Sequence, residues 1–120
     1  MTIRAVAVLV ACATAVGCGG GHSKAPPTQR DISVITAAVS DIVYQCQAAA
    51  AQYIAGPDRD ALARDVDRLV SAAGRLEADA PFRLARGSRT TLRAQLGIAT
   101  RSLRARCSPN QATRLDDAAK

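Results

Sequence analysis

The chain has 120 residues, a formal net charge of +6 at pH 7 and a sequence pI near 9.8. This length excludes more than one small domain, and a core without tryptophan and with only three aromatic residues must rely on small side chains. Small side chains bury little apolar surface, which contributes about 25 cal/mol per Å², so we expect a covalent staple to matter for stability. The basic charge permits attraction to anionic lipids or polymers without identifying a partner.

The first 17 residues join a positive charge to an apolar run. Arg4 is followed by 13 uncharged residues, which end in small side chains before Cys18 in the stretch "AVGC". That run has the length of a signal-peptide hydrophobic region and is too short to span a membrane. The segment resembles the signal peptide and lipobox of bacterial lipoproteins.

Two cysteines compete for the lipidated position of that motif. The stretch "LVAC", ending at Cys12, has the better lipobox letters but lies too close to Arg4. The stretch ending at Cys18 has the right distance from Arg4 and continues into "GGGHSKAPPTQ", a suitable tether. The resemblance implies that residues 1–17 are cleaved off and that Cys18 carries a diacylglycerol thioether. Two or three acyl chains anchor a protein stably, so it also implies a place on the extracytoplasmic face of the bacterial cell membrane.

Two other interpretations of the N-terminus stay open. Cleavage after the Ala-Thr-Ala site that ends at Ala15 would release a secreted protein without lipid. Alternatively, the apolar segment is a buried helix of a cytosolic protein. All three interpretations concern location and imply no activity.

Residues 18–29 are interpreted as the lipid-anchored cysteine and a flexible linker, because they are rich in glycine and proline. The only histidine, His22, lies in this linker, and we expect it to be solvated rather than to act as a ligand or a base. Thr28 and Asp31 have the spacing of a helix capping box. The folded domain is therefore expected to begin at about residue 30.

Three helical stripes follow, with apolar residues spaced alternately three and four positions apart. They run from Ile32 to Tyr53, from Leu62 to Ala80 and from Leu92 to Cys107. Three helices with short connections predict an all-α fold, an up-down-up three-helix bundle over residues 30–108. The alternative is a helical hairpin with a loosely docked third helix. Residues 109–120 are expected to form a polar tail.

The connections between the stripes supply caps and a cover for the core. Asp58 is expected to cap the second helix and Ser88 the third. In the basic connector "FRLARG", we expect Phe82 and Leu84 to cover one end of the core.

Cys46 and Cys107 lie on the first and third stripes, about 17 and 18 residues from their helix starts. The first and third helices of an up-down-up bundle run parallel, so both cysteines reach the same level, some 26 Å along the axis. In an exported domain this predicts a Cys46–Cys107 disulfide. The alternative is two buried thiols that act as small hydrophobic residues. We expect no zinc site, because two thiolates without histidines fall short of four ligands.

A basic flank is predicted on the third helix, where arginines are frequent and acids absent. It is a candidate site for anionic lipid, glycan or another acidic ligand, and its residues are Arg86, Arg93, Arg101 and Arg104. The alternative is a solvated flank that faces the acids of the second helix, namely Asp60, Asp65, Asp67, Glu77 and Asp79.

A second candidate surface lies on the first helix, whose only charge between Ile32 and Ala55 is Asp41. We expect its small, uncharged face to contact another protein or a second copy of the chain, through Ala37, Tyr44, Ala48 and Ala51. The alternative is an alanine-rich exposed helix without a partner.

No residue pattern supports catalysis, a cofactor, a metal or nucleic-acid binding. The expected domain has no histidine and no glycine-rich phosphate loop, and its few aromatic residues are not interleaved with arginines for base stacking. We therefore expect a membrane-anchored lipoprotein that carries a small, non-enzymatic helical interaction module for an envelope protein. The alternative function is binding of an anionic ligand through the basic flank.

Overall fold

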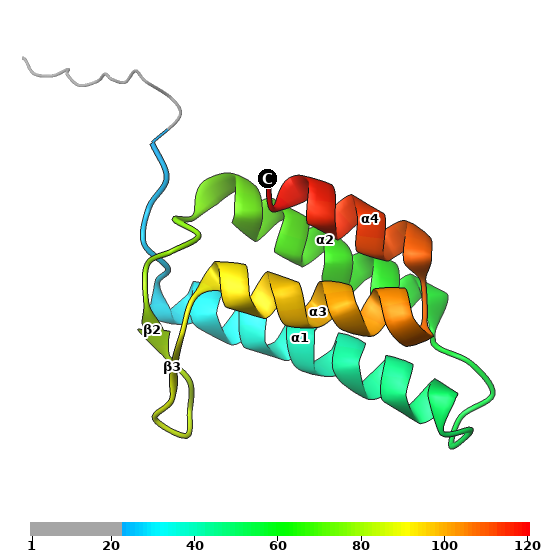
Figure 1. The fold of residues 1–120 in the computed structure, drawn as a ribbon. Helices are drawn as coiled ribbons and strands as arrows, with labels where there is room; N and C mark the ends of the chain where they lie inside the picture. Colours follow the sequence, from blue (N-terminus) through cyan, green and yellow to red (C-terminus); the bar gives the residue numbers. More distant parts are fainter. Residues whose placement is uncertain (1–22) are drawn as a thin grey trace, which may run out of the picture.

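A computed structural model of the protein describes residues 23–120, which are mostly helical (Figure 1). Its helices are α1 (Gln29–Ala50), α2 (Arg59–Arg75), α3 (Leu92–Arg106) and α4 (Pro109–Ala118). Between α2 and α3, strands β2 (Phe82–Arg83) and β3 (Arg89–Thr90) form a small antiparallel hairpin in which Phe82 pairs with Thr90. The helical fold class is confirmed, but the described residues contain four helices rather than the predicted three.

The helices alternate in direction along the chain. Figure 1 shows α1 and α3 running one way and α2 and α4 the other. α1 packs against α2 and α3, and α4 completes the bundle by packing against α3 and α2. The core between them contains most of each predicted stripe, including the buried residues Ile42, Val66 and Leu96.

Local capping determines where α1 begins and ends. Thr28 Oγ1 accepts a hydrogen bond from the Asp31 backbone N at 3.2 Å, and the Thr28 backbone N donates to Asp31 Oδ2 at 2.9 Å. This is the predicted capping box. At the other end, Gln52 has φ of +65°, and the Tyr53 backbone N donates to the Ala48 carbonyl at 2.9 Å. That turn is a Schellman motif, which ends the helix before Tyr53.

Tyr53 therefore leaves the core stripe on which it was predicted. Its side chain is 85% exposed, because the left-handed residue before it turns the chain away from the bundle. The prediction that the first stripe stays in the core as far as Tyr53 is wrong.

The caps of the next two helices agree only in part with the predictions. Asp58 caps α2 as expected, since its Oδ1 accepts from the Ala61 backbone N at 3.0 Å. The cap of α3 is Thr91, whose Oγ1 accepts from the Ala94 backbone N at 3.1 Å, and not Ser88. Ser88 instead belongs to the hairpin, where its carbonyl accepts from the Leu84 backbone N at 2.8 Å.

Residues 109–120 are not a polar tail, because they contain the ten-residue helix α4. Pro109 ends α3 and begins α4 in the first turn, where a missing backbone N–H costs nothing. Ala112 and Leu115 are fully buried in the core. These two buried side chains, three positions apart, pack α4 against the rest of the bundle.

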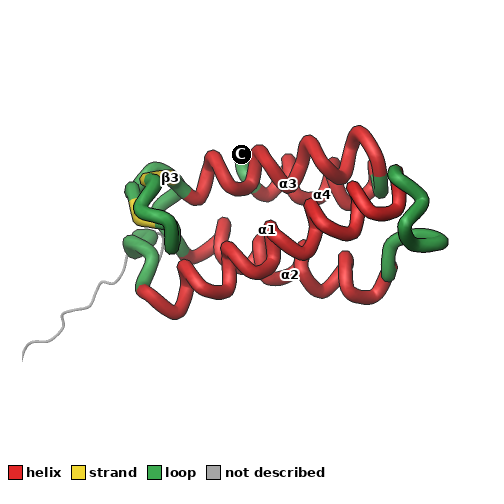
Figure 2. Tube along the Cα trace, turned by 90° about the horizontal axis from the view of Figure 1, so that it is seen from below, coloured by secondary structure: helices red, strands yellow, loops and turns green. Residues whose placement is uncertain are grey.

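The last residues of the predicted linker lie against the domain. The Ala25 backbone N donates to the Arg75 carbonyl at 3.1 Å, and the Ala25 carbonyl accepts from the Glu77 backbone N at 2.8 Å. Lys24 Nζ donates to the Ala73 carbonyl at 3.0 Å. The chain thus enters at the end of α2, beside the start of α1 and the hairpin (Figures 1 and 2).

The predicted signal peptide over residues 1–17, the candidate cysteines Cys12 and Cys18, the alternative cleavage site at Ala15 and the solvated His22 lie outside the described residues. Within residues 23–120, only α1 is long and apolar enough to cross a membrane by length and composition, with a mean hydropathy of 1.2. Its buried residues include Ile35, Val39 and Ile42, which belong to the core of the bundle.

Candidate functional site

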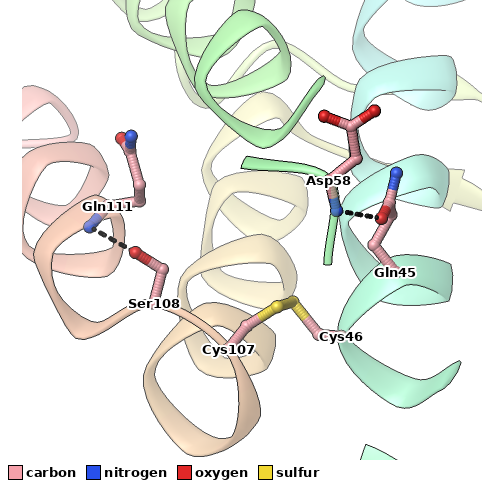
Figure 3. The surroundings of a disulfide bond; sticks show 6 residues. All are labelled: Gln45, Cys46, Asp58, Cys107, Ser108 and Gln111. Carbon is pink, nitrogen blue, oxygen red and sulfur yellow. Dashed lines mark hydrogen bonds between the residues drawn. A yellow bond between two sulfur atoms is a disulfide. The ribbon is translucent and has the colours of Figure 1, made fainter. Parts of the chain in front are cut away.

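Cys46 and Cys107 form the predicted disulfide, which joins the last turns of α1 to the end of α3 (Figure 3). Their Cα atoms are 5.1 Å apart, and 61 positions separate them in sequence. Cys46 is fully buried, and Cys107 packs partly buried against the core. The parallel course of α1 and α3 thus brings the two cysteines to one level, as predicted.

A residue beside each cysteine helps to start a further helix (Figure 3). Gln45 Oε1 accepts a hydrogen bond from the backbone N of Asp58, the cap of α2, at 2.9 Å. Ser108 Oγ accepts from the Gln111 backbone N at 3.4 Å and caps α4. The bridge therefore lies where all four helices meet, and we call this region the disulfide end.

The predicted basic flank is present in part. Arg93, Arg101 and Arg104 line one surface hollow of about 420 Å³ between α3 and the end of α4, together with Lys120. Arg86 does not join them, because it lies in the hairpin turn and lines a different hollow. The sequence spacing could not place Arg86, since it precedes the helix that orients the other three.

Acids balance part of this flank. Arg93 makes two hydrogen bonds to the carboxylate of Asp79, the shorter at 2.8 Å, which lower the pKa of Asp79 and raise the pKa of Arg93. Arg104 Nη2 lies 3.8 Å from Oδ2 of Asp116 in α4. Among residues 23–120, Arg101 has no ion pair.

The alternative, in which the flank faces the second-helix acids, is also only partly right. Of those acids, Asp79 alone pairs with an arginine of α3 in the described part of the chain, and Asp79 follows the end of α2 at Arg75 rather than lying on that helix. Asp67 pairs instead with Arg114 of the unpredicted helix α4.

The candidate protein-contact residues also separate into two groups. Tyr44, Ala48 and Ala51 line a hollow of about 310 Å³ at the disulfide end, and Tyr53 joins them. Tyr44 is 63% exposed, while Ala48 is buried and so cannot itself be an exposed contact residue. Ala37 is exposed but does not line this hollow. We call Tyr44, Ala51 and Tyr53 the tyrosine surface.

One buried carboxyl group, that of Asp65 in α2, was not predicted from the sequence. Asp65, expected among the acids that face the solvated basic flank, is only 4% exposed, and its Oδ2 has no hydrogen-bond partner among the described residues. Burial and the adjacent Asp41 carboxyl of α1 raise the pKa of Asp65 to about 7, against the opposing charges of Arg68 and Arg64. The spacing could have revealed it, because Asp65 lies three positions after Leu62 and four before Leu69, both of which are buried.

Within residues 23–120, no three histidine, cysteine or acidic side chains gather closely enough to hold a metal ion. The candidate functional features are therefore the disulfide, the tyrosine surface and the two hollows lined by arginines. No protein-family model, curated protein or solved structure matches the chain.

Proposed function

We propose that this protein is a lipid-anchored extracytoplasmic protein whose helical domain binds another envelope protein without catalysing a reaction. The observation that carries the proposal is the Cys46–Cys107 disulfide. Disulfides persist in oxidising, extracytoplasmic compartments and are rare in the cytosol. The bridge thus supports export independently of the N-terminal resemblance, which nominates Cys18 as the lipidated residue.

The arrangement of the domain supports a contact at the disulfide end. The chain that follows Cys18 enters at the opposite end, where Ala25 is hydrogen-bonded to the end of α2. α1 has 22 residues, and at about 1.5 Å per residue this places the tyrosine surface roughly 30 Å from the entry point. A domain anchored through Cys18 therefore presents the tyrosine surface away from the lipid.

The exposed aromatic residues favour a protein as the partner. Tyr44 and Tyr53 are 63% and 85% exposed, although the chain has only three aromatic residues. Tyrosine is enriched in protein interfaces, because its ring buries apolar area and its hydroxyl finds a hydrogen-bond partner. Ala48 and Ala51 contribute only small side chains to the hollow that the two tyrosines also line.

The anchor is tested by mass spectrometry of the membrane-associated protein and by the variant Cys18→Ala, with Cys12→Ala as the matched control. We expect Cys18→Ala and the signal-peptidase inhibitor globomycin each to cause accumulation of the unprocessed precursor. The Cys12→Ala variant should be processed normally. Unchanged processing of Cys18→Ala would contradict the lipoprotein assignment, and a mass beginning at Val16 would establish secretion without lipid.

The contact is tested with Tyr44→Glu and the control Val34→Glu. Both residues are exposed on α1, but Val34 lies outside the tyrosine surface. After crosslinking in cells, we expect Tyr44→Glu to lose the captured envelope protein and Val34→Glu to retain it. Equal capture by both variants would refute the assigned face.

The hollow between α3 and α4 supports a second candidate function, the binding of an anionic ligand. The observation behind it is Arg101, which has no ion pair among the described residues and stands between Arg93 and Arg104. Binding there should weaken steeply as the salt concentration rises and should be lost in Arg101→Gln. A contact through the tyrosine surface should tolerate both changes.

A further inference from the structure

The end of the domain that the N-terminal chain enters carries an excess of positive charge. We define this tether end as residues 23–33 and 75–93, which contain seven cations and three acids. Two of the acids are already paired, Asp31 with Arg75 and Asp79 with Arg93. The exposed arginines of the hairpin have no ion pair within residues 23–120, and these are Arg83, Arg86 and Arg89.

Two of these arginines line a groove between the hairpin and α1. A hollow of about 690 Å³ separates the hairpin from the first turns of α1, with Arg83 and Arg86 on one wall. The opposite wall contributes hydroxyl groups from Ser33, Thr36 and Ser40. Guanidinium groups bind phosphate through charge-assisted hydrogen bonds. The hydroxyls of Ser33 and Ser40 across the groove can donate to further phosphate oxygens, whereas the Thr36 hydroxyl already donates to the Ile32 carbonyl at 2.8 Å.

The chain between Cys18 and Ala25 limits how far this groove lies from a lipid anchor. The two residues are seven positions apart, so even a fully extended chain spans at most about 25 Å. Ala25 is hydrogen-bonded to Arg75 and Glu77 at the tether end. Both views show the hairpin at this same end of the bundle (Figures 1 and 2).

We propose that the groove between the hairpin and α1 binds the phosphate groups of anionic phospholipids in the membrane that holds Cys18. This inference rests on the proposed lipid anchor but uses a different surface from the protein contact. A lipid headgroup is favoured as the occupant because the chain between Cys18 and Ala25 is short, because the hairpin arginines have no ion pair among the described residues, and because hydroxyl groups of α1 face them across the groove. The consequence is a domain that stands on its tether end and directs the tyrosine surface outward.

The test measures binding of the unlipidated chain from residue 19 onward to vesicles, by co-sedimentation. This chain contains every described residue and the whole core. The vesicles are either phosphatidylcholine alone or a mixture with phosphatidylglycerol. The variant Arg83→Gln/Arg86→Gln is compared with Arg59→Gln/Arg106→Gln, which removes the same charge from the disulfide end, and thermal unfolding checks that both variants fold.

We expect binding to the anionic vesicles only, and weaker binding at high salt. An arginine near an anionic surface contributes about a five-fold factor to affinity, so the hairpin variant should bind about 30-fold more weakly. The control variant should bind nearly as well as the unaltered chain. Equal binding to neutral vesicles, or equal losses in both variants, would overturn the proposal.

This readout does not depend on the anchor. If Cys18 proves unmodified while the unlipidated chain still binds anionic vesicles through Arg83 and Arg86, the proposed anchor fails and the groove assignment stands. If Cys18 is lipidated and the vesicles are not bound, the groove assignment alone fails.

Discussion

Breaking the Cys46–Cys107 bridge is expected to destabilise the domain by about 4 kcal/mol. The two cysteines are 61 positions apart, and closing a loop of that length in the unfolded chain removes conformational entropy worth about that free energy at 25 °C. The loss corresponds to a factor of about 1,000 in the ratio of folded to unfolded protein. Small domains have total stabilities of about 5–15 kcal/mol, so the reduced protein should be close to unfolding.

The assay is urea denaturation followed by the helical circular dichroism signal, with and without reductant. With a urea dependence of about 1–2 kcal/mol per M for a domain of this size, the midpoint should fall by about 2–4 M on reduction. The variant Cys46→Ala/Cys107→Ala serves as the control, because its midpoint should not respond to reductant. For each protein, the midpoint with reductant is compared with the midpoint of the same protein without reductant, because alanine at the fully buried Cys46 also changes core packing.

A midpoint shift on reduction equivalent to less than about 1 kcal/mol would refute the loop-entropy argument. An equal response in the double variant would show that the reductant acts elsewhere. Alkylation followed by intact mass confirms which thiols are reduced in each sample.

Three further measurements test the core, the caps and the fourth helix. Burial and Asp41 raise the pKa of Asp65 from 3.8 to about 7, so the folded protein holds a proton that the unfolded chain releases above pH 4. Stability should therefore fall between about pH 4 and pH 7, by at most about 4 kcal/mol. Asp65→Asn should abolish this pH dependence of the free energy of unfolding and should stabilise the domain at pH 8. The exposed control Glu77→Gln should keep the pH dependence. An unchanged pH dependence in Asp65→Asn would contradict the burial argument. Thr28→Ala removes the α1 cap and should cost about 1 kcal/mol in urea denaturation; no loss would mean that the capping box is dispensable. Leu115→Ala should cost about 2–5 kcal/mol because the side chain is fully buried, and a loss no larger than that of the exposed control Thr113→Ala would show that α4 does not belong to the core.

The sequence alone determined the features that depend on spacing along one helix. The three apolar stripes, the caps at Thr28 and Asp58 and the cysteine pairing follow from helical periodicity, hydrogen-bonding chemistry and the equal rise of two parallel helices. These features are local or are linked by one simple geometric relation. They could therefore be predicted before the arrangement of the helices was known.

Only the tertiary structure decided the features that depend on a neighbouring element. α4 has ten residues, too few for a stable isolated helix, and it exists because Leu115 finds a core to enter. Asp65 is buried because α1 packs over it, and Tyr53 is exposed because a left-handed turn ends α1 early. Arg86 lines a groove with α1 rather than the flank of α3, because the hairpin places it beside the first turns of α1. In each case the deciding contact joins residues whose distance in space the linear pattern does not encode.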